Sequence, residues 1–426
     1  MRFPSIQYSF PAFATMATVG GLCLGSYLAP PIQPVVFPTR KTETPNDTPE
    51  APPKPTHSKH TEDSYTYVQL SRGFVYPLTN SLVDPFASYM DAKGGYWMNY
   101  SFRTQDPRNP MFDQKINRIF FSRKSEAGRW ARGAFLPAEY NGRPLTASDQ
   151  VKLRQDGAMF RSWGNYLTAV PHALRLGTNV IALNELAKNG KGNGLLEKAV
   201  VMSDTAAVVG HCTDIPLYAY GLGQISRGNE AGAVPALMGA HRVNIVSNTI
   251  QMLTGGLRIY TESQRNKLTG KSNPSVYLYS FLDIGMGLYF GLLSLYLLRR
   301  VRQFRRSKEG ADVQAQNNIL LCITKIPTSI QDSMRLFAAF GAASGIGVNA
   351  TLFYHSMLTN SMLQQYADRI ATSSSLGLLA GGFAFASALL YTPASLPIAR
   401  AFWGFNALFL SAQTLHDLWP NLKELF

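Results

Sequence analysis

Cysteine is scarce in this 426-residue chain, which has only Cys23, Cys212 and Cys322. They are far apart and odd in number, which argues against a disulfide framework and against a Cys-x-x-Cys redox pair. His211, Cys212 and Asp214 invite a metal site, but nothing nearby supplies the three or four ligands that zinc normally takes. A Walker A loop, a nucleophile elbow and an H-E-x-x-H motif are also missing. We therefore expect a non-catalytic protein with no cofactor and no metal.

Acidic residues are few compared with basic ones. The chain has 26 Asp and Glu against 40 Lys and Arg, a formal charge of +14, and no acid before Glu43. Such a balance suits nucleic acid, an anionic membrane surface or the inside of an organelle. Without zinc-type spacing or an aromatic-basic RNP pattern, nucleic acid is not the expected partner. Charges become scarce after about residue 335. The expected partner is therefore the lipid bilayer.

One long apolar run stands out. Residues 277–298, "YLYSFLDIGMGLYFGLLSLYLL", contain a single charge, Asp283. Roughly 20 apolar residues are needed for a helix to cross the hydrocarbon core. Tyr277 and Tyr279 stand at one end, where interfacial aromatic residues belong. A basic flank follows at the other end, formed by Arg299, Arg300, Arg302, Arg305 and Arg306. The pattern predicts a membrane span.

Two further spans are predicted at about 336–358 and 374–392, and a shorter segment, 401–415, is expected to lie in the interface or to form half a hairpin. The basic segment 299–335 belongs on the cytosolic or matrix side by the positive-inside rule. Small residues four positions apart let membrane helices approach closely. The residues expected to pack helices in this way are Gly287, Gly291, Gly341 and Gly345.

Two polar residues fall inside the predicted spans, Asp283 and His355. A carboxylate at this depth is costly unless it is paired, protonated or near the headgroups. We interpret Asp283 as a structural residue near one interface that pairs with a neighbouring helix, with a proton or ion relay as the alternative. For His355 we expect an interhelical hydrogen bond first and a relay second.

The N-terminal part has three sections. Residues 1–30 are acid-free and are read as an organellar targeting segment or an anchor helix over 11–29, in preference to a secretory signal. Residues 31–60 form a Pro-rich linker, expected to be disordered. Residues 61–147 are rich in aromatic and turn-forming residues and are interpreted as an irregular extramembrane docking region with short strands or helices.

The middle section, 148–276, is interpreted as amphipathic and helical. Thr146 or Ser148 can cap a helix that continues to about 190, with apolar and basic residues interleaved. This helix fits a membrane interface or the surface of a protein partner, and Pro171 is expected to break or kink it. The stretches 195–229 and 233–267 are poor spans or long helices packed beside the membrane. The predicted class is mainly α, a multi-pass α-helical membrane protein, with 277–418 as its transmembrane region.

The order of elements from about 150 to 395 resembles the peroxin-11 family of peroxisomal membrane-elongation proteins. The matching pieces are the basic helix at 150–190, "HCTDIPLYAYGLGQI" around Asp214, "ITKIPTSIQDSMRLFAAFG" around Asp332 and "SSSLGLLAGGFAFAS" at 373–387. The resemblance implies membrane insertion and curvature by amphipathic helices, without catalysis.

Three functions follow from these patterns. The first is a non-catalytic accessory or structural subunit of a mitochondrial inner-membrane complex, with protein partners in that complex or a homo-oligomer. The alternative is a peroxin-11-like membrane-shaping protein of the peroxisomal membrane. The second alternative is a small-solute transporter, against which stand only about three clear spans and one buried acid.

Overall fold

The computed structural model describes residues 10–29, 66–102, 126–140, 143–188, 194–269, 273–309, 328–359, 364–391 and 396–425. Within these ranges the chain is helical and contains no strand, which confirms the mainly α class. The elements are α1 (Phe10–Leu28), η2 (Ser71–Val75), α3 (Tyr76–Phe102), α5 (Glu126–Phe135), η4 (Ala138–Tyr140), α6 (Ala147–Lys188), α7 (Leu195–Ser226), α8 (Glu230–Thr269), α9 (Pro274–Glu309), α11 (Thr328–Met357), α12 (Gln364–Leu390) and α13 (Leu396–Leu425).

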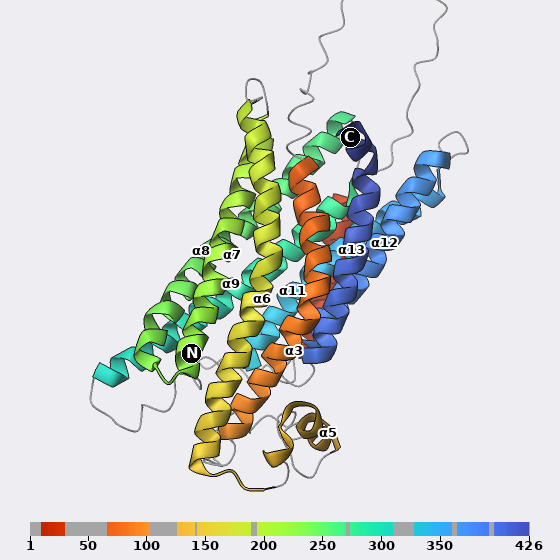
Figure 1. Cartoon of the computed structure of the whole chain (residues 1–426). Coiled ribbons are helices and arrows are strands. Elements are labelled where there is room, and N and C mark those ends of the chain that lie inside the picture. Colours follow the sequence, from red (N-terminus) through yellow and green to blue (C-terminus); the bar gives the residue numbers. More distant parts are fainter. Residues whose placement is uncertain are drawn as a thin grey trace, which may run out of the picture.

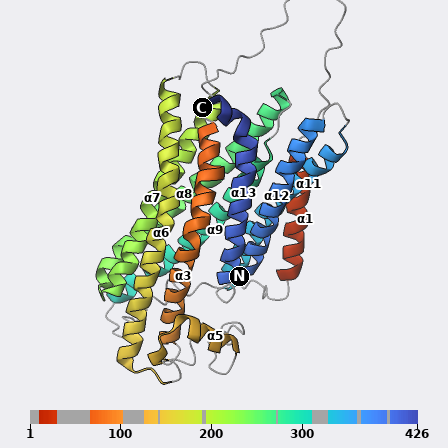
Figure 2. The same ribbon diagram turned by 45° about the vertical axis from the view of Figure 1, so that its right-hand side comes forward.

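The long helices form one bundle (Figure 1). Consecutive helices pack on each other from α3 through α6, α7, α8 and α9, and again from α9 through α11, α12 and α13. Helix α13 packs on α3, which closes the bundle, and α1 packs on the outside of α11 (Figure 2). Helix α9 runs obliquely to its neighbours, and the short α5 lies at one end (Figure 1).

The interpretation of 61–147 as irregular is wrong for residues 66–102, which form one helical stretch through η2 and α3. Gly94 of α3 allows the backbone of this helix to approach that of α6 closely and does not form a turn. A Cβ on Gly157 of α6 would lie 2.7 Å from the carbonyl oxygen of Gly94 of α3, so neither position has room for a side chain. Among the described residues of this region, the short α5 and η4 at 126–140 fit the interpretation as irregular. The predicted linker 31–60 lies outside the described residues.

Helix α6 begins with a capping box. The Thr146 Oγ1 accepts a hydrogen bond from the Asp149 N–H at 3.2 Å, and the Thr146 N–H donates to Asp149 Oδ2 at 2.8 Å. Pro171 does not end α6, as one of the two predicted effects required, because the helix continues to Lys188. Pro171 is buried along the packed length of α6, and the contacts with α3 and α7 offset the lost backbone hydrogen bond.

Four helices are long and apolar enough to cross a membrane, counted over the described residues: Phe10–Leu28, Pro274–Arg306, Ile330–Met357 and Gln364–Leu390. They overlap the three predicted spans and the N-terminal segment interpreted as an anchor. The segment 401–415 is longer than expected, because it lies within the 30-residue α13. Its buried polar residues, among them Asn406, Gln413 and Thr414, lower its hydropathy.

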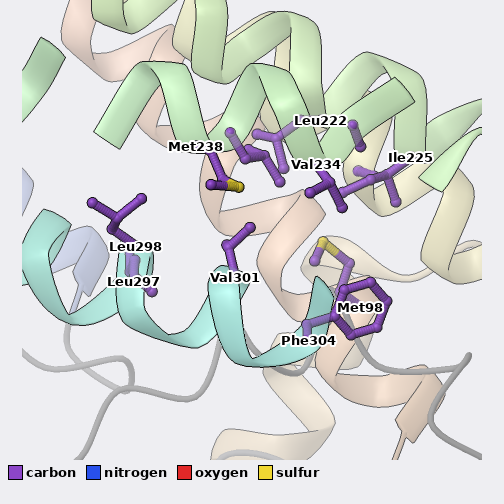
Figure 3. Close-up of a cluster of buried hydrophobic side chains, with 12 residues drawn as sticks. Met98, Leu222, Ile225, Val234, Met238, Leu297, Leu298, Val301 and Phe304 are labelled. Carbon is purple, nitrogen blue, oxygen red and sulfur yellow. The ribbon is translucent and has the colours of Figure 1, made fainter. Parts of the chain in front are cut away.

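The largest apolar cluster joins five helices, α3, α6, α7, α8 and α9 (Figure 3). Met98 comes from α3, Leu222 from α7 and Val234 from α8, and they pack with the C-terminal part of α9 around Val301 and Phe304. Burying side chains of this size contributes about 1.5–3 kcal/mol each. This cluster fixes the end of the bundle at which α9 becomes basic.

Candidate functional site

A carboxylate with four partners lies inside the bundle. Asp204 of α7 is completely buried. Its Oδ1 accepts hydrogen bonds from Arg175 Nη2 at 2.7 Å, from Arg72 Nη1 at 3.3 Å and from Arg258 Nη2. Its Oδ2 accepts one from Asn179 Nδ2 at 2.7 Å. Three arginines from η2, α6 and α8 therefore converge on one acid of α7.

Asp283, found in the sequence as a lone charge in an apolar run, joins the same group. Its Oδ2 accepts a hydrogen bond from Arg258 Nη1 at 3.1 Å and forms an ion pair with Arg72. Its Oδ1 accepts a hydrogen bond from Gln251 Nε2 at 3.0 Å. Arg72 and Arg258 thus bridge Asp204 and Asp283. We call Arg72, Arg175, Arg258, Asp204 and Asp283 the arginine–aspartate network; it links η2, α6, α7, α8 and α9.

A polar arm continues the network along α7 and α8. The His211 imidazole has Nε2 at 2.8 Å from Gln251 Oε1 and Nδ1 at 3.3 Å from Asp214 Oδ2. Since the Gln251 amide nitrogen donates to Asp283, its oxygen accepts from His211 Nε2–H. Asn244 Nδ2 donates to the same Asp214 oxygen at 2.5 Å. Polar contacts of 2.5 to 3.3 Å therefore connect Asn244 to Asp283 through Asp214, His211 and Gln251.

A second ionic group closes the bundle between α3, α6 and α13. Arg161 Nε donates to Asp91 Oδ1 at 2.9 Å. Arg400 Nη1 donates to Ser88 Oγ at 2.9 Å and lies 3.4 Å from Asp84 Oδ1. Arg400 Nη2 lies 3.6 Å from Asp91 Oδ2. The two arginines and two acids come from segments far apart in the sequence, and each charge meets an opposite one.

The outer face of α6 carries no charge over most of its length. From 157 to 183 every exposed residue is uncharged, and the two arginines of this stretch, Arg161 and Arg175, lie in the ionic groups inside. The large exposed apolar residues are Met159, Trp163, Tyr166, Val170, Leu174, Val180 and Ile181. A water-soluble bundle has the opposite arrangement, with charges outside and apolar residues inside.

Helices α7 and α8 repeat this pattern. Both charges of α7 between 199 and 226, Asp204 and Asp214, are buried. Between 243 and 264 both charges of α8, Arg258 and Glu262, are buried. The large exposed apolar residues of these stretches are Met202, Val209, Tyr220, Val246, Leu253 and Tyr260. Hydropathy averages over both faces of a helix and so underrates these two.

The predicted glycine pairs lie at helix contacts. A Cβ on Gly341 would be 2.6 Å from the Phe281 carbonyl oxygen, and one on Gly345 would be 3.2 Å from the Leu278 Cα, so α11 lies directly on α9. A Cβ on Gly287 would be 2.8 Å from Met252 Cγ of α8. Gly291 is looser, since its Cβ would make an ordinary contact at 3.7 Å with the Cβ of Asn248.

His355 and the basic flank lie away from the network. The hydrogen bond expected from the His355 ring to another helix is not found among the described residues; the ring meets the neighbouring Tyr354 edge-on. Most of the predicted basic flank is exposed at the end of α9: Arg299, Arg302, Arg305 and Arg306.

Sequence reasoning missed Arg72, Arg175, Arg258 and Asp204. The signal that could have found one of them, Asp204, is its isolation: with Asp214 it is one of two acids in a stretch of α7 that is otherwise uncharged from 199 to 226. The arginines gave no such signal, because they occur among other polar residues. Within the described ranges, no three His, Cys, Asp or Glu side chains are grouped so that they could hold a metal ion.

No protein-family model, no curated protein and no solved structure matches the chain.

Proposed function

We propose that this chain is a polytopic integral membrane protein of an organelle, and that it is a non-catalytic structural subunit of a mitochondrial inner-membrane complex. The observation that carries the proposal is the inverted charge distribution, with ion pairs inside and uncharged faces outside. This arrangement suits a bundle whose solvent is lipid.

Nine of the described helices are long enough to cross a membrane. They are α1, α3, α6, α7, α8, α9, α11, α12 and α13. The uncharged outer face of α6, from 157 to 183, is about 40 Å long at the α-helical rise. That exceeds the roughly 30 Å of a hydrocarbon core. On α3 and α13 the exposed Phe86 and Phe405 likewise face outward, and Asp84 and Arg400 pair inside.

The positive-inside rule supports one orientation. If each helix crosses once, the segment between α3 and α6 and the segment between α9 and α11 lie on the same side. The first, 103–146, has nine basic and four acidic residues, and 299–327 has seven basic and two acidic ones. Figure 1 shows α5 and the basic end of α9 toward the same end of the bundle. We assign this end to the matrix.

A structural role is supported by the pairing of the buried charges. Asp204, Arg175 and Arg258 are at most 2% exposed, and each has an oppositely charged partner. Charges held in this way connect helices and are not offered to a substrate. The mitochondrial location is supported by the acid-free first 42 residues and the pI of about 9.6.

The test is fractionation of cells that express the C-terminally tagged protein. Membranes are extracted with carbonate and then analysed on a native gel beside mitochondrial and peroxisomal markers. Carbonate-resistant protein that comigrates with a large mitochondrial complex supports the proposal. Small oligomers in peroxisomal membranes support the peroxin-11-like alternative. Release into the carbonate supernatant contradicts both, because the helices would not cross a bilayer.

The peroxin-11-like alternative requires an amphipathic helix with its polar face in water. In α6 two of the basic residues of that face, Arg161 and Arg175, form ion pairs with Asp91 and Asp204. This favours α6 as a bundle helix over α6 as a wedge in one leaflet, and therefore favours the structural subunit.

A small-solute transporter is the second candidate, and one observation favours it. The objections from sequence were few spans and one buried acid. The bundle has nine long described helices and contains a buried network with two acids and three arginines. Uptake of labelled small anions and cations into proteoliposomes tests it. Uptake that is lost in an Asp283→Asn variant that still inserts and assembles, and kept in an exposed-acid variant, Asp368→Asn, would favour transport over the structural role.

A further inference from the structure

An open pocket of about 550 Å³ lies between the first turns of α8 and the last turns of α9. Val234, Pro235 and Met238 of α8 and Phe304 of α9 form its apolar walls. Val234, Met238 and Phe304 also belong to the apolar cluster of Figure 3. The pocket is therefore a place where the apolar interior reaches the surface.

The charge of the pocket has one sign. Arg242 of α8 and Arg305 of α9 line it, and no acid is among the described residues that do so. Arg299 and Arg302 are exposed on the same end of α9. Two guanidinium groups beside an apolar wall suit a ligand with an anionic oxygen group and a hydrocarbon part.

The position of the pocket along the helices further restricts the class of ligand. The outer face of α8 is uncharged from 243 to 264, so Arg242 stands where this face begins. On α9 the exposed Leu292 and Leu295 precede the exposed Arg299. The arginines of the pocket thus lie at the boundary between an apolar belt and a basic end. In a membrane this boundary is the level of the lipid headgroups.

We propose that this pocket binds an anionic phospholipid of the leaflet on the basic side, an assignment that depends on the membrane insertion proposed above. The phosphate oxygens accept charge-assisted hydrogen bonds from Arg242 and Arg305. The start of an acyl chain lies on Val234, Met238 and Phe304. A soluble phosphate would use the arginines and leave the apolar wall uncovered.

Native mass spectrometry of the full-length protein in detergent tests the assignment, with equal amounts of phosphatidylglycerol and phosphatidylcholine added. Wild type is expected to retain the first phosphatidylglycerol about tenfold better, a difference of about 1.4 kcal/mol. The double variant Arg242→Gln/Arg305→Gln should lose this preference. The matched double variant Arg299→Gln/Arg302→Gln removes the same charge outside the pocket and should keep it. Equal loss in both variants would overturn the site and leave only general charge attraction.

Further measurements distinguish a bound phospholipid from free inorganic phosphate and detect variants that fail to insert. Ala231→Phe, at an exposed position of the pocket lining, fills the apolar part without changing charge and should also lower phosphatidylglycerol retention. Millimolar inorganic phosphate should not displace the lipid from wild type; complete displacement would overturn the lipid assignment in favour of a free-phosphate site. Each variant is first extracted with carbonate. Insertion without lipid preference contradicts the pocket alone, whereas failure of wild type to insert contradicts the proposed function.

Discussion

Arg258 of α8 donates from Nη1 to Asp283 Oδ2 of α9 at 3.1 Å, and its other terminal nitrogen donates to Asp204 of α7. One side chain, 1% exposed, therefore connects two acids on two other helices. A single buried ion pair is weak evidence for stability, because removing both charges from water offsets much of the attraction. Removal of Asp204 is a different matter, since it takes away the paired acid of Arg175 and leaves Arg72 and Arg258 with Asp283.

Asp204→Asn should destabilise the protein strongly. The change leaves Arg72, Arg175 and Arg258 facing a neutral amide inside the bundle, and breaking a buried pair in this way costs about 3–5 kcal/mol. Thermal unfolding of the detergent-solubilised protein measures the loss. The exposed acid Asp368 on α12 provides the control, and Asp368→Asn should stay within about 0.5 kcal/mol. Equal unfolding midpoints for both variants would mean that the network does not hold the bundle together.

Asp283→Asn should be milder than Asp204→Asn. The Asp283 side chain is 17% exposed, and an asparagine keeps the oxygen that accepts from Gln251. In a double-mutant cycle with Arg258→Gln, we expect a coupling energy of about 0.5–3 kcal/mol. Assembly into the native complex should survive the single Asp283→Asn change. Complete loss of function with normal insertion and assembly would point instead to a proton or ion relay through Asp283.

Asp283 could be predicted from the sequence and its partners could not, for a physical reason. A single charge in an apolar run is conspicuous because nothing nearby dilutes it. Arg72, Arg175 and Arg258 occur in polar-looking stretches, and only folding reveals that they face inward. Hydropathy is averaged over all faces of a helix, so the apolar outer faces of α6, α7 and α8 could not be recognised from the sequence. Helices α9, α11 and α12 are apolar on most faces, and their spans were predicted. The glycines of 61–147 were taken for turn residues because composition does not distinguish a turn from a tight helix contact.

Gly341→Ala and Gly382→Ala should have opposite effects. A methyl group at Gly341 of α11 would lie 2.6 Å from the Phe281 backbone oxygen, so α9 and α11 must move apart. Such overpacking costs about 1–3 kcal/mol. A methyl group at the exposed Gly382 of α12 meets nothing within 4 Å among the described residues. There alanine should stabilise the helix by roughly 0.5–1 kcal/mol. Thermal unfolding of the two variants measures both effects. Equal shifts of the unfolding midpoint would mean that the close contact at Gly341 does not determine stability.

The start of α6 should be sensitive to acid. Hydrogen bonds from Arg143, and from the backbone and side chain of Thr146, hold the pKa of the Asp149 carboxyl well below its usual range. The folded pKa lies below the unfolded one, so this cap is complete at neutral pH and is lost as pH falls through the folded pKa. Asp149→Asn should therefore speed amide exchange in the first turn of α6 at pH 7. The difference from wild type should shrink in strong acid; a difference that persists there would contradict the role of the ionised carboxylate.

Cysteine labelling should place Glu126 on one side of the membrane and both Lys188 and Lys423 on the other. One described helix, α6, separates 126 from 188, and six separate 188 from 423. Single Glu126→Cys, Lys188→Cys and Lys423→Cys variants, in a chain whose three native cysteines are replaced by alanine, are treated in mitoplasts with an impermeant maleimide. We expect positions 188 and 423 to react at once and position 126 only after detergent is added. If 126 and 188 react together, α6 lies on the membrane surface, as a wedge would. If 423 reacts with 126 instead, α13 packs against the bundle without crossing, and its low hydropathy would be the better guide.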